Sequence, residues 1–157
     1  MSQGSRKACD YIEAHFSGLG LIPWGTAESF KHSIFSGTNV IAVLPGSDPV
    51  LKDEIVLISA HYDHFGEGRM GAADNASGVA AVLELATRFS TAQQAPKRTL
   101  VFVAFDCEER DLWGAVAFVM RKDVDPRAIV LNVNIDMLGR KGFDVMENTL
   151  FMAESHV

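Results

Sequence analysis

One segment constrains the fold more than any other part of the chain: Thr99–Phe105 (TLVFVAF), in which six apolar residues follow one another. A short continuous run that is rich in β-branched and aromatic residues and has no polar alternation is typical of a strand buried on both faces. Such strands occur in sheets with helices on both sides. This segment therefore predicts an α/β fold with Thr99–Phe105 inside the sheet.

The rest of the chain fits an alternation of strands and helices. Apolar periodicity predicts helices at Ser5–Phe16, Ser77–Phe89 and Leu112–Met120, and strands at Asn39–Leu44, Glu54–Ala60 and Ala128–Ile135. The last strand is expected to be buried like Thr99–Phe105, and Phe30–Phe35 is a further extended candidate. Pro45-Gly46-Ser47-Asp48-Pro49 is strong turn chemistry, which predicts an antiparallel hairpin between the first two strands.

Composition restricts the class of protein and its partners. A length of 157 residues with 48% hydrophobic and 22% charged residues fits one soluble domain, residues 1–157. The net charge of −6 argues against a nucleic-acid partner, and no apolar run is long enough for a membrane span. The N-terminal segment lacks the apolar core of a secretory signal, so we expect a cytoplasmic protein or one whose leader is absent from this chain.

Polar residues that can bind metals follow three of the predicted strands. His61 and Asp63 follow the second strand, Glu108 and Glu109 follow Thr99–Phe105, and Asp136 ends the last strand. In open α/β sheets, ligands bind at the carboxyl ends of the strands. We therefore expect these side chains to converge on one site, although they are scattered along the sequence.

Each candidate has a functional and a structural interpretation. Asp63 is placed to orient the His61 imidazole, or else to cap a surface loop. Asp74 lies among small residues before a helix, where it could bind a ligand, but Asp74, Asn75 or Ser77 could equally be a helix N-cap.

The remaining candidates are carboxylates at strand ends. Glu108 and Glu109 could divide metal binding and proton transfer between them, or form a solvated acidic turn. Asp136 ends an apolar strand, where a carboxylate is costly unless it binds a metal or pairs with a residue such as Arg140.

Taken together, ISAHYDHFG, GAADNASGVAAVLELA, VFVAFDCEERDLWGA and NVNIDMLGR resemble the M28 family of zinc aminopeptidases, from about residue 39 to residue 140. The resemblance implies that His61 and Asp136 bind a first zinc ion, Asp74 bridges to a second, and Glu109 binds the second. It further implies Glu108 as general base, Asp63 as the partner of His61, and a cis peptide bond after Asp74.

The resemblance also implies the fold and the reaction. The expected fold is a three-layer αβα sandwich with a mixed, largely parallel central sheet. The expected reaction is removal of N-terminal amino acids from peptides that have a free N-terminus, with two zinc ions in a complete site. Members of the family are often secreted or periplasmic. Ala73, Arg110 and Asp111 depart from the family pattern.

Family members are longer and supply a further zinc-binding histidine far downstream, so we expect the C-terminal strands and this ligand of the second ion to be missing here. His156 follows Asp136 too closely to replace that histidine. Missing strands would leave an open sheet edge and favour oligomerisation.

Three alternatives stay open. The first is an inactive fragment that binds at most one metal. The second is a related enzyme of the same fold, such as a carboxypeptidase or a single-zinc glutaminyl cyclase. The third is a dinucleotide-binding domain, because residues 66–71 read G-x-G-x-x-G, although the predicted helix begins several residues later than such a site requires.

Overall fold

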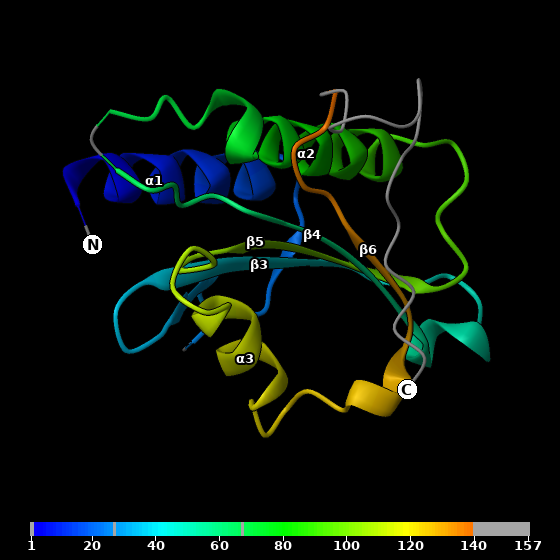
Figure 1. Ribbon diagram of the computed structural model, residues 1–157. Helices are drawn as coiled ribbons and strands as arrows, with labels where there is room; N and C mark the ends of the chain where they lie inside the picture. The colour runs from blue at the N-terminus through cyan, green and yellow to red at the C-terminus, as the bar shows by residue number, and fades with distance from the viewer. Residues whose placement is uncertain (1, 27, 67, 140–157) are drawn as a thin grey trace, which may run out of the picture.

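The computed structural model describes residues 2–26, 28–66 and 68–139, which form a mixed six-stranded sheet between helical layers (Figure 1). The strands are β1 (Ile22–Pro23), β2 (Lys31–Ser33), β3 (Thr38–Leu44), β4 (Ile55–His61), β5 (Thr99–Phe105) and β6 (Ile129–Asn134). Their order is β1-β3-β5-β4-β6, with β2 also paired to β3. β5, β4 and β6 run parallel, whereas β3 is antiparallel to β1, β2 and β5.

Helices cover both faces of the sheet, as predicted. α1 (Gln3–Gly18) and α2 (Ser77–Ser90) lie on one face, and α3 (Trp113–Val119) lies on the other (Figure 1). Short helical turns occur at Leu51–Asp53, Ala72–Ala76 and Pro126–Ala128. The α/β class and the three layers expected from the sequence are confirmed. No helix in the described ranges is long and apolar enough to cross a membrane.

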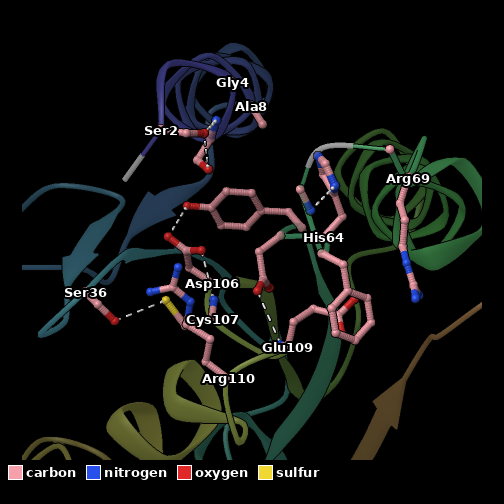
Figure 2. Close-up of a pocket in the computed structure, with 16 residues that line it drawn as sticks. Ser2, Gly4, Ala8, Ser36, His64, Arg69, Asp106, Cys107, Glu109 and Arg110 are labelled. Carbon is pink, nitrogen blue, oxygen red and sulfur yellow. Dashed lines mark hydrogen bonds between the residues drawn. The ribbon is translucent and has the colours of Figure 1, made fainter.

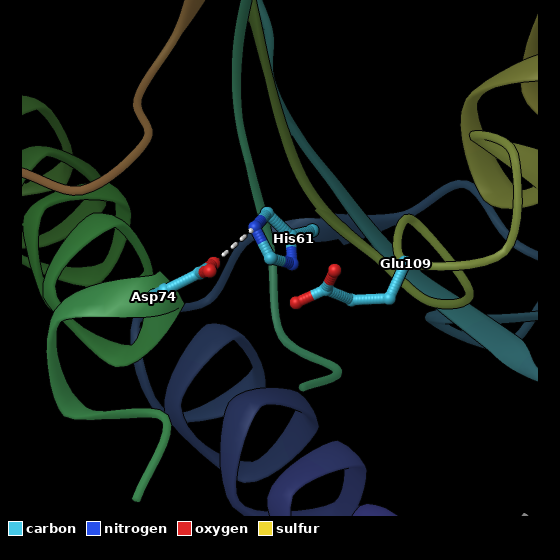
Figure 3. Close-up of side chains that lie close together, drawn as sticks. All are labelled: His61, Asp74 and Glu109. Atoms are coloured by element: carbon cyan, nitrogen blue, oxygen red, sulfur yellow. Dashed lines mark ion pairs between the residues drawn. The ribbon is translucent and has the colours of Figure 1, made fainter. Parts of the chain in front are cut away.

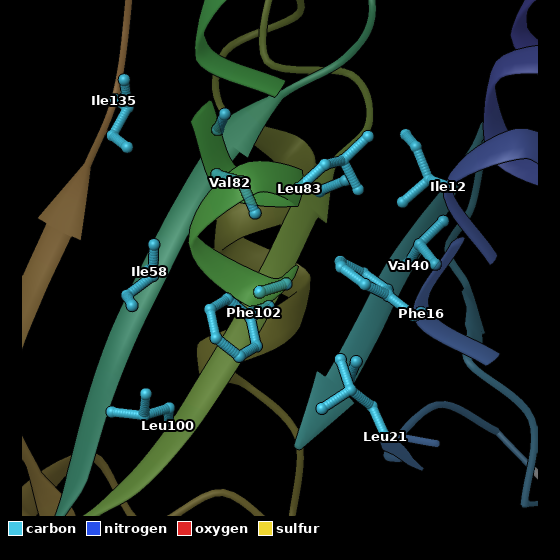
Figure 4. Close-up of a cluster of buried hydrophobic side chains, with 14 of the residues drawn as sticks. Ile12, Phe16, Leu21, Val40, Ile58, Val82, Leu83, Leu100, Phe102 and Ile135 are labelled. Carbon is cyan, nitrogen blue, oxygen red and sulfur yellow. The ribbon is translucent and has the colours of Figure 1, made fainter. Parts of the chain in front are cut away.

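β5 joins the two hydrophobic cores, because successive side chains of a strand point to opposite faces. Leu100, Phe102 and Ala104 pack with α1 and α2 residues such as Phe16 and Val82 (Figure 4). Val101, Val103 and Phe105 instead pack with Phe118 of α3. All six of these β5 residues are buried, so the prediction of a strand buried on both faces is confirmed.

Two expectations about the sheet are wrong. β3 and β4 do not form a hairpin, because β5 lies between them, antiparallel to β3 and parallel to β4. The ten-residue connection 45–54 is long enough to pass over β5. The turn residues of this connection therefore end β3 but do not determine which strand pairs with β3. β6 is a strand but not a buried one: it lies at an edge of the described sheet, with Val130 50% and Leu131 44% exposed.

Candidate metal centre

The residues singled out in the sequence meet at the carboxyl ends of the three parallel strands. His61 is the last residue of β4, Glu108 and Glu109 follow β5, and Asp136 comes two residues after β6. Asp74 joins them from the irregular turn Ala72–Ala76 that precedes α2. The parallel strands β5, β4 and β6 and the turn before α2 therefore assemble one imidazole and four carboxylates from four separate parts of the sequence.

The buried imidazole of His61 lies at the middle of this cluster, with 3% of its side chain exposed. Its Nε2 lies 3.2 Å from Oδ1 of Asp74, 3.5 Å from Oδ1 of Asp136 and 3.8 Å from Oε2 of Glu108. His61, Asp74 and Glu109 offer ligand atoms within 4.8 Å of one another (Figure 3), and so do His61, Glu108 and Asp136.

Asp63 connects His61 to both glutamates. His61 Nδ1 lies 3.1 Å from the main-chain oxygen of Asp63 and 3.6 Å from its Oδ1. The two carboxylate oxygens of Asp63 accept hydrogen bonds from the backbone N–H groups of Glu108, at 3.0 Å, and Glu109, at 3.3 Å. One side chain therefore faces the far side of the imidazole and also fixes the start of the glutamate loop.

Asn75 performs a similar task for Asp136. It is 1% exposed, and the Asp74–Asn75 peptide bond is cis, as the resemblance implies. Its Oδ1 accepts hydrogen bonds from Gly78 N at 3.0 Å, as a helix cap does, and from Met137 N at 3.2 Å. Its Nδ2 donates to Ile135 O at 2.9 Å. The sequence offered Asn75 as one of three N-cap candidates. Its hydrogen bonds to Ile135 and Met137, the two neighbours of Asp136, were not predicted, because those partners lie about sixty positions away.

A second buried network holds the beginning of the glutamate loop. Oδ2 of Asp106 accepts hydrogen bonds from Thr38 N at 2.8 Å and from the Tyr62 hydroxyl at 3.0 Å, and its Oδ1 accepts from Cys107 N at 2.9 Å. Asn39 Oδ1 accepts from Asp106 N at 3.0 Å. The sequence signal for Asn39 was a polar residue at the start of an apolar strand.

Burial and crowding shift the protonation of the cluster. Burial raises the pKa of Glu108, as do the nearby carboxylates Asp136, Asp63 and Asp74, although a protonated His61 opposes them. Burial also raises the pKa of Glu109, helped by Asp74 and Glu108.

For His61, burial lowers the pKa, but the hydrogen bond to Asp63 and the charges of Glu108 and Asp136 outweigh it and raise the pKa to about 9. Without a metal, the proton on His61 therefore supplies the positive charge that offsets the carboxylates of the cluster.

The donor set fits zinc. Imidazole nitrogen and carboxylate oxygen are both zinc ligands, and ligands about 2.1 Å from a tetrahedral ion lie about 3.4 Å apart. The separations of 3.2 and 3.5 Å from His61 Nε2 to Asp74 and Asp136 match that spacing. Oε1 of Glu109 is buried without a hydrogen-bond partner in the described structure, and such an atom is costly unless a cation meets it. Arg140 and His156 lie outside the described residues.

Sequence comparisons match much of this chain to known proteins. The model of peptidase family M28 matches residues 39–155. Leupeptin-inactivating enzyme 1 of Streptomyces exfoliatus is 32% identical over 137 residues, which cover 87% of this chain and 30% of the relative.

Solved structures give the same result for the fold. The zinc aminopeptidase BSAP of Bacillus subtilis matches with a TM-score of 0.56 and 29% identity, over 66% of this chain and 25% of that one. Glutaminyl cyclase of Tannerella forsythia shares the fold, with a TM-score of 0.58 and 19% identity over 90% of this chain and 56% of that one. The chain thus spans only part of each of these proteins. It belongs to peptidase family M28.

Proposed function

We propose that this chain carries the metal centre of a zinc-dependent aminopeptidase, which removes amino acids from the free N-terminus of peptides. The observation that supports this most is the cluster itself: three carboxylates lie within 3.2–3.8 Å of the buried Nε2 of His61 at the carboxyl ends of parallel strands. Membership of a peptidase family supports peptides as substrates.

In this proposal His61 and Asp136 would hold one zinc ion, Glu109 would hold a second, and Asp74 would be a ligand shared by both. Zinc bound there supplies a Lewis acid that polarises the scissile carbonyl and lowers the pKa of water. Asp63 keeps the His61 ring oriented through the contacts at its Nδ1.

Glu108 is the proposed general base. It takes a proton from the attacking water and delivers it to the leaving amine. Burial raises its pKa in the metal-free chain, and a carboxylate with a pKa nearer neutrality accepts and releases protons more readily at working pH. The hydrogen bond from its backbone N–H to Asp63 fixes it beside His61.

A cavity of about 480 Å³ lies beside the cluster and offers room for the first residue of a peptide. Asp74, Glu109 and Arg69 line it together with the apolar side chains Phe65, Met70 and Met137. Its apolar walls suit the side chain of that first residue.

A second candidate function is a domain that binds a single zinc ion and hydrolyses nothing. The observation in its favour is that both candidate ligand groups in the described residues contain His61, and one imidazole nitrogen binds only one ion.

Metal content and peptidase activity of the purified chain separate these candidates. If the chain holds two zinc ions, we expect hydrolysis of L-leucine p-nitroanilide, with Glu108→Gln lowering kcat about 10²–10⁴-fold while zinc content stays the same. Glu84→Gln, on the outer face of α2, is the matched control and leaves both unchanged. One zinc ion without hydrolysis supports the single-ion candidate, and hydrolysis that is unaffected by Glu108→Gln refutes the proposed role of Glu108.

A further inference from the structure

Arg110 departs from the family pattern directly after the two glutamates, and the proposed reaction gives it no task. The two residues after it, Asp111 and Leu112, have left-handed backbone conformations, with φ of 59° and 60°. This conformation is unfavourable for leucine in particular. The loop thus turns sharply into α3 and leaves Arg110 on the wall of a cleft beside the metal centre.

This cleft has a volume of about 760 Å³, within the range of small-molecule sites. Glu109 of the metal centre lines this cleft together with Asp63, and Arg110 and Ser36 line it as well. Figure 2 shows Glu109, Arg110 and Ser36 around the cleft. Glu109 and Arg69 also line the 480 Å³ cavity, so the two spaces adjoin at these residues. Asp74 lines only the smaller cavity, whereas Arg110 lines only the larger cleft.

The guanidinium of Arg110 is available to a ligand. In the described part of the chain, no side chain forms a hydrogen bond or an ion pair with it, whereas Arg88, Arg98, Arg121 and Arg127 each pair with a carboxylate. Arg69, the other arginine of the cleft, stacks on the Phe65 ring at 4.5 Å from the centroid. A guanidinium without a partner at the wall of a cleft is suited to a carboxylate, which it can bind through two parallel hydrogen bonds.

We propose that Arg110 binds a carboxylate of the substrate on the leaving side of the scissile bond. This inference rests on the proposed function, and it defines the preferred substrate as a short peptide with a negative charge beyond the metal centre. The cavity at Asp74 takes the amino end of the peptide, and the cleft at Arg110 takes the carboxylate end. Two groups can supply this charge, the α-carboxylate of a di- or tripeptide and an acidic side chain, and the experiment separates these two sources.

Zinc decides whether the cleft attracts a carboxylate. Among the described residues of its wall, two arginines, Arg69 and Arg110, face three carboxylates, Asp63, Asp106 and Glu109. The buried oxygens of Asp106 and Asp63 are engaged by backbone N–H groups and the Tyr62 hydroxyl, while Glu109 has a buried oxygen free for a metal. A divalent ion at Glu109 turns the balance of charge positive, so carboxylate binding depends on the metal.

The test is calorimetric binding of peptides to zinc-loaded Glu108→Gln protein, which requires no turnover. The probes are Leu-Gly-Gly, its C-terminal amide, and the amide of Leu-Glu-Gly. We expect Leu-Gly-Gly to bind about fivefold more tightly than its amide, as for one exposed ion pair. Adding Arg110→Gln abolishes the difference, and Arg110→Lys restores part of it. Arg127→Gln, which removes a distant exposed arginine, leaves it unchanged.

The outcomes are distinct from those of the proposed function. Tighter binding of the Leu-Glu-Gly amide than of the Leu-Gly-Gly amide, again lost in Arg110→Gln, assigns the site to an acidic side chain, and tighter binding of Leu-Gly-Gly alone assigns it to the α-carboxylate. Equal binding of acid and amides, or a difference that persists in Arg110→Gln, overturns the inference. Hydrolysis of L-leucine p-nitroanilide, which has no carboxylate, still tests the peptidase in either case.

Discussion

At the scale of single residues, the main feature of the metal centre is its excess of negative charge. Four carboxylates surround one buried imidazole, and in the described part of the metal-free chain the proton on His61 opposes their charge. That proton is held because Asp63 faces Nδ1 while Glu108 and Asp136 face Nε2. Zinc would take over this task with twice the charge, so metal binding displaces the proton.

This balance predicts how the stability of the metal-free protein depends on pH. The pKa of His61 is about 9 in the folded chain, above its ordinary value of 6.5. Its contribution to stability is therefore complete below pH 6.5 and is lost as the pH rises through 9. The raised pKa values of Glu108 and Glu109 likewise make stability fall as the pH rises, but at lower pH.

We expect the melting temperature of the chelator-treated protein to fall between pH 6.5 and 9, and the fall to be smaller in His61→Gln. His64→Gln is the control, because His64 is exposed and its Nδ1 contacts only a neighbouring backbone N–H group. A slope that is the same in His61→Gln and in the parent chain would show that His61 is not the titrating group.

At the scale of elements, the glutamate loop is fixed by the docking of α3 on the end of β5. Asn39 of β3 donates to the carbonyl of Gly114 at 2.8 Å and accepts from Asp106 N at 3.0 Å, so it joins β3, the loop and α3. A Cβ on Gly114 would lie 2.2 Å from the backbone oxygen of Asp106 and 2.6 Å from Oδ1 of Asn39. α3 can therefore approach only because residue 114 has no side chain.

Gly114→Ala is predicted to destabilise the protein by about 1–3 kcal/mol, since backbone atoms must shift to admit the methyl group. It should also weaken zinc binding, because the loop that carries Glu108 and Glu109 moves with α3. Urea unfolding and zinc titration measure the two effects. Gly18→Ala at the end of α1, where a Cβ meets nothing within 4 Å, is the control and should change neither. Equal stability of both variants would contradict close docking of α3.

The sequence predicted elements better than it predicted their partners. The helices at residues 77 and 113 and the strand β5 lie within a residue or two of their expected positions, because periodicity and apolar runs are local properties. The hairpin was wrong because pairing depends on what else competes for an edge, and β5 offers two apolar faces and two free edges. All five candidate ligand and base residues do meet, since parallel strands bring their carboxyl ends together. The hydrogen bonds of Asn39 and Asn75 to other segments could not be predicted, because their partners are remote in sequence.

At the scale of the whole molecule, the two sides of the described sheet differ. One side carries the short strands β1 and β2, and the other ends at β6, which has exposed apolar side chains at Val130 and Leu131. An edge strand of this kind is a template for pairing with another chain. This supports the expectation of oligomerisation through a sheet edge, which remains a prediction.

We expect the chain to self-associate with rising concentration, and Val130→Lys on β6 to shift it toward monomer in sedimentation velocity. The matched control is Val119→Lys on α3, which is also 50% exposed and is not in the sheet. If Val119→Lys has the same effect, or Val130→Lys has none, association does not occur through β6.

The hydrogen bonds of Asn75 to the two neighbours of Asp136 have a consequence for the kinetics of folding. Asn75 and its partner Met137 are 62 positions apart, and Asp136 follows β6, which pairs with β4. Contacts between remote segments form late, because loop closure precedes any gain from them. An ion that binds the completed cluster would therefore leave the folding rate almost unchanged and slow unfolding instead. The metal would therefore stabilise the domain after it has folded and would not nucleate its folding.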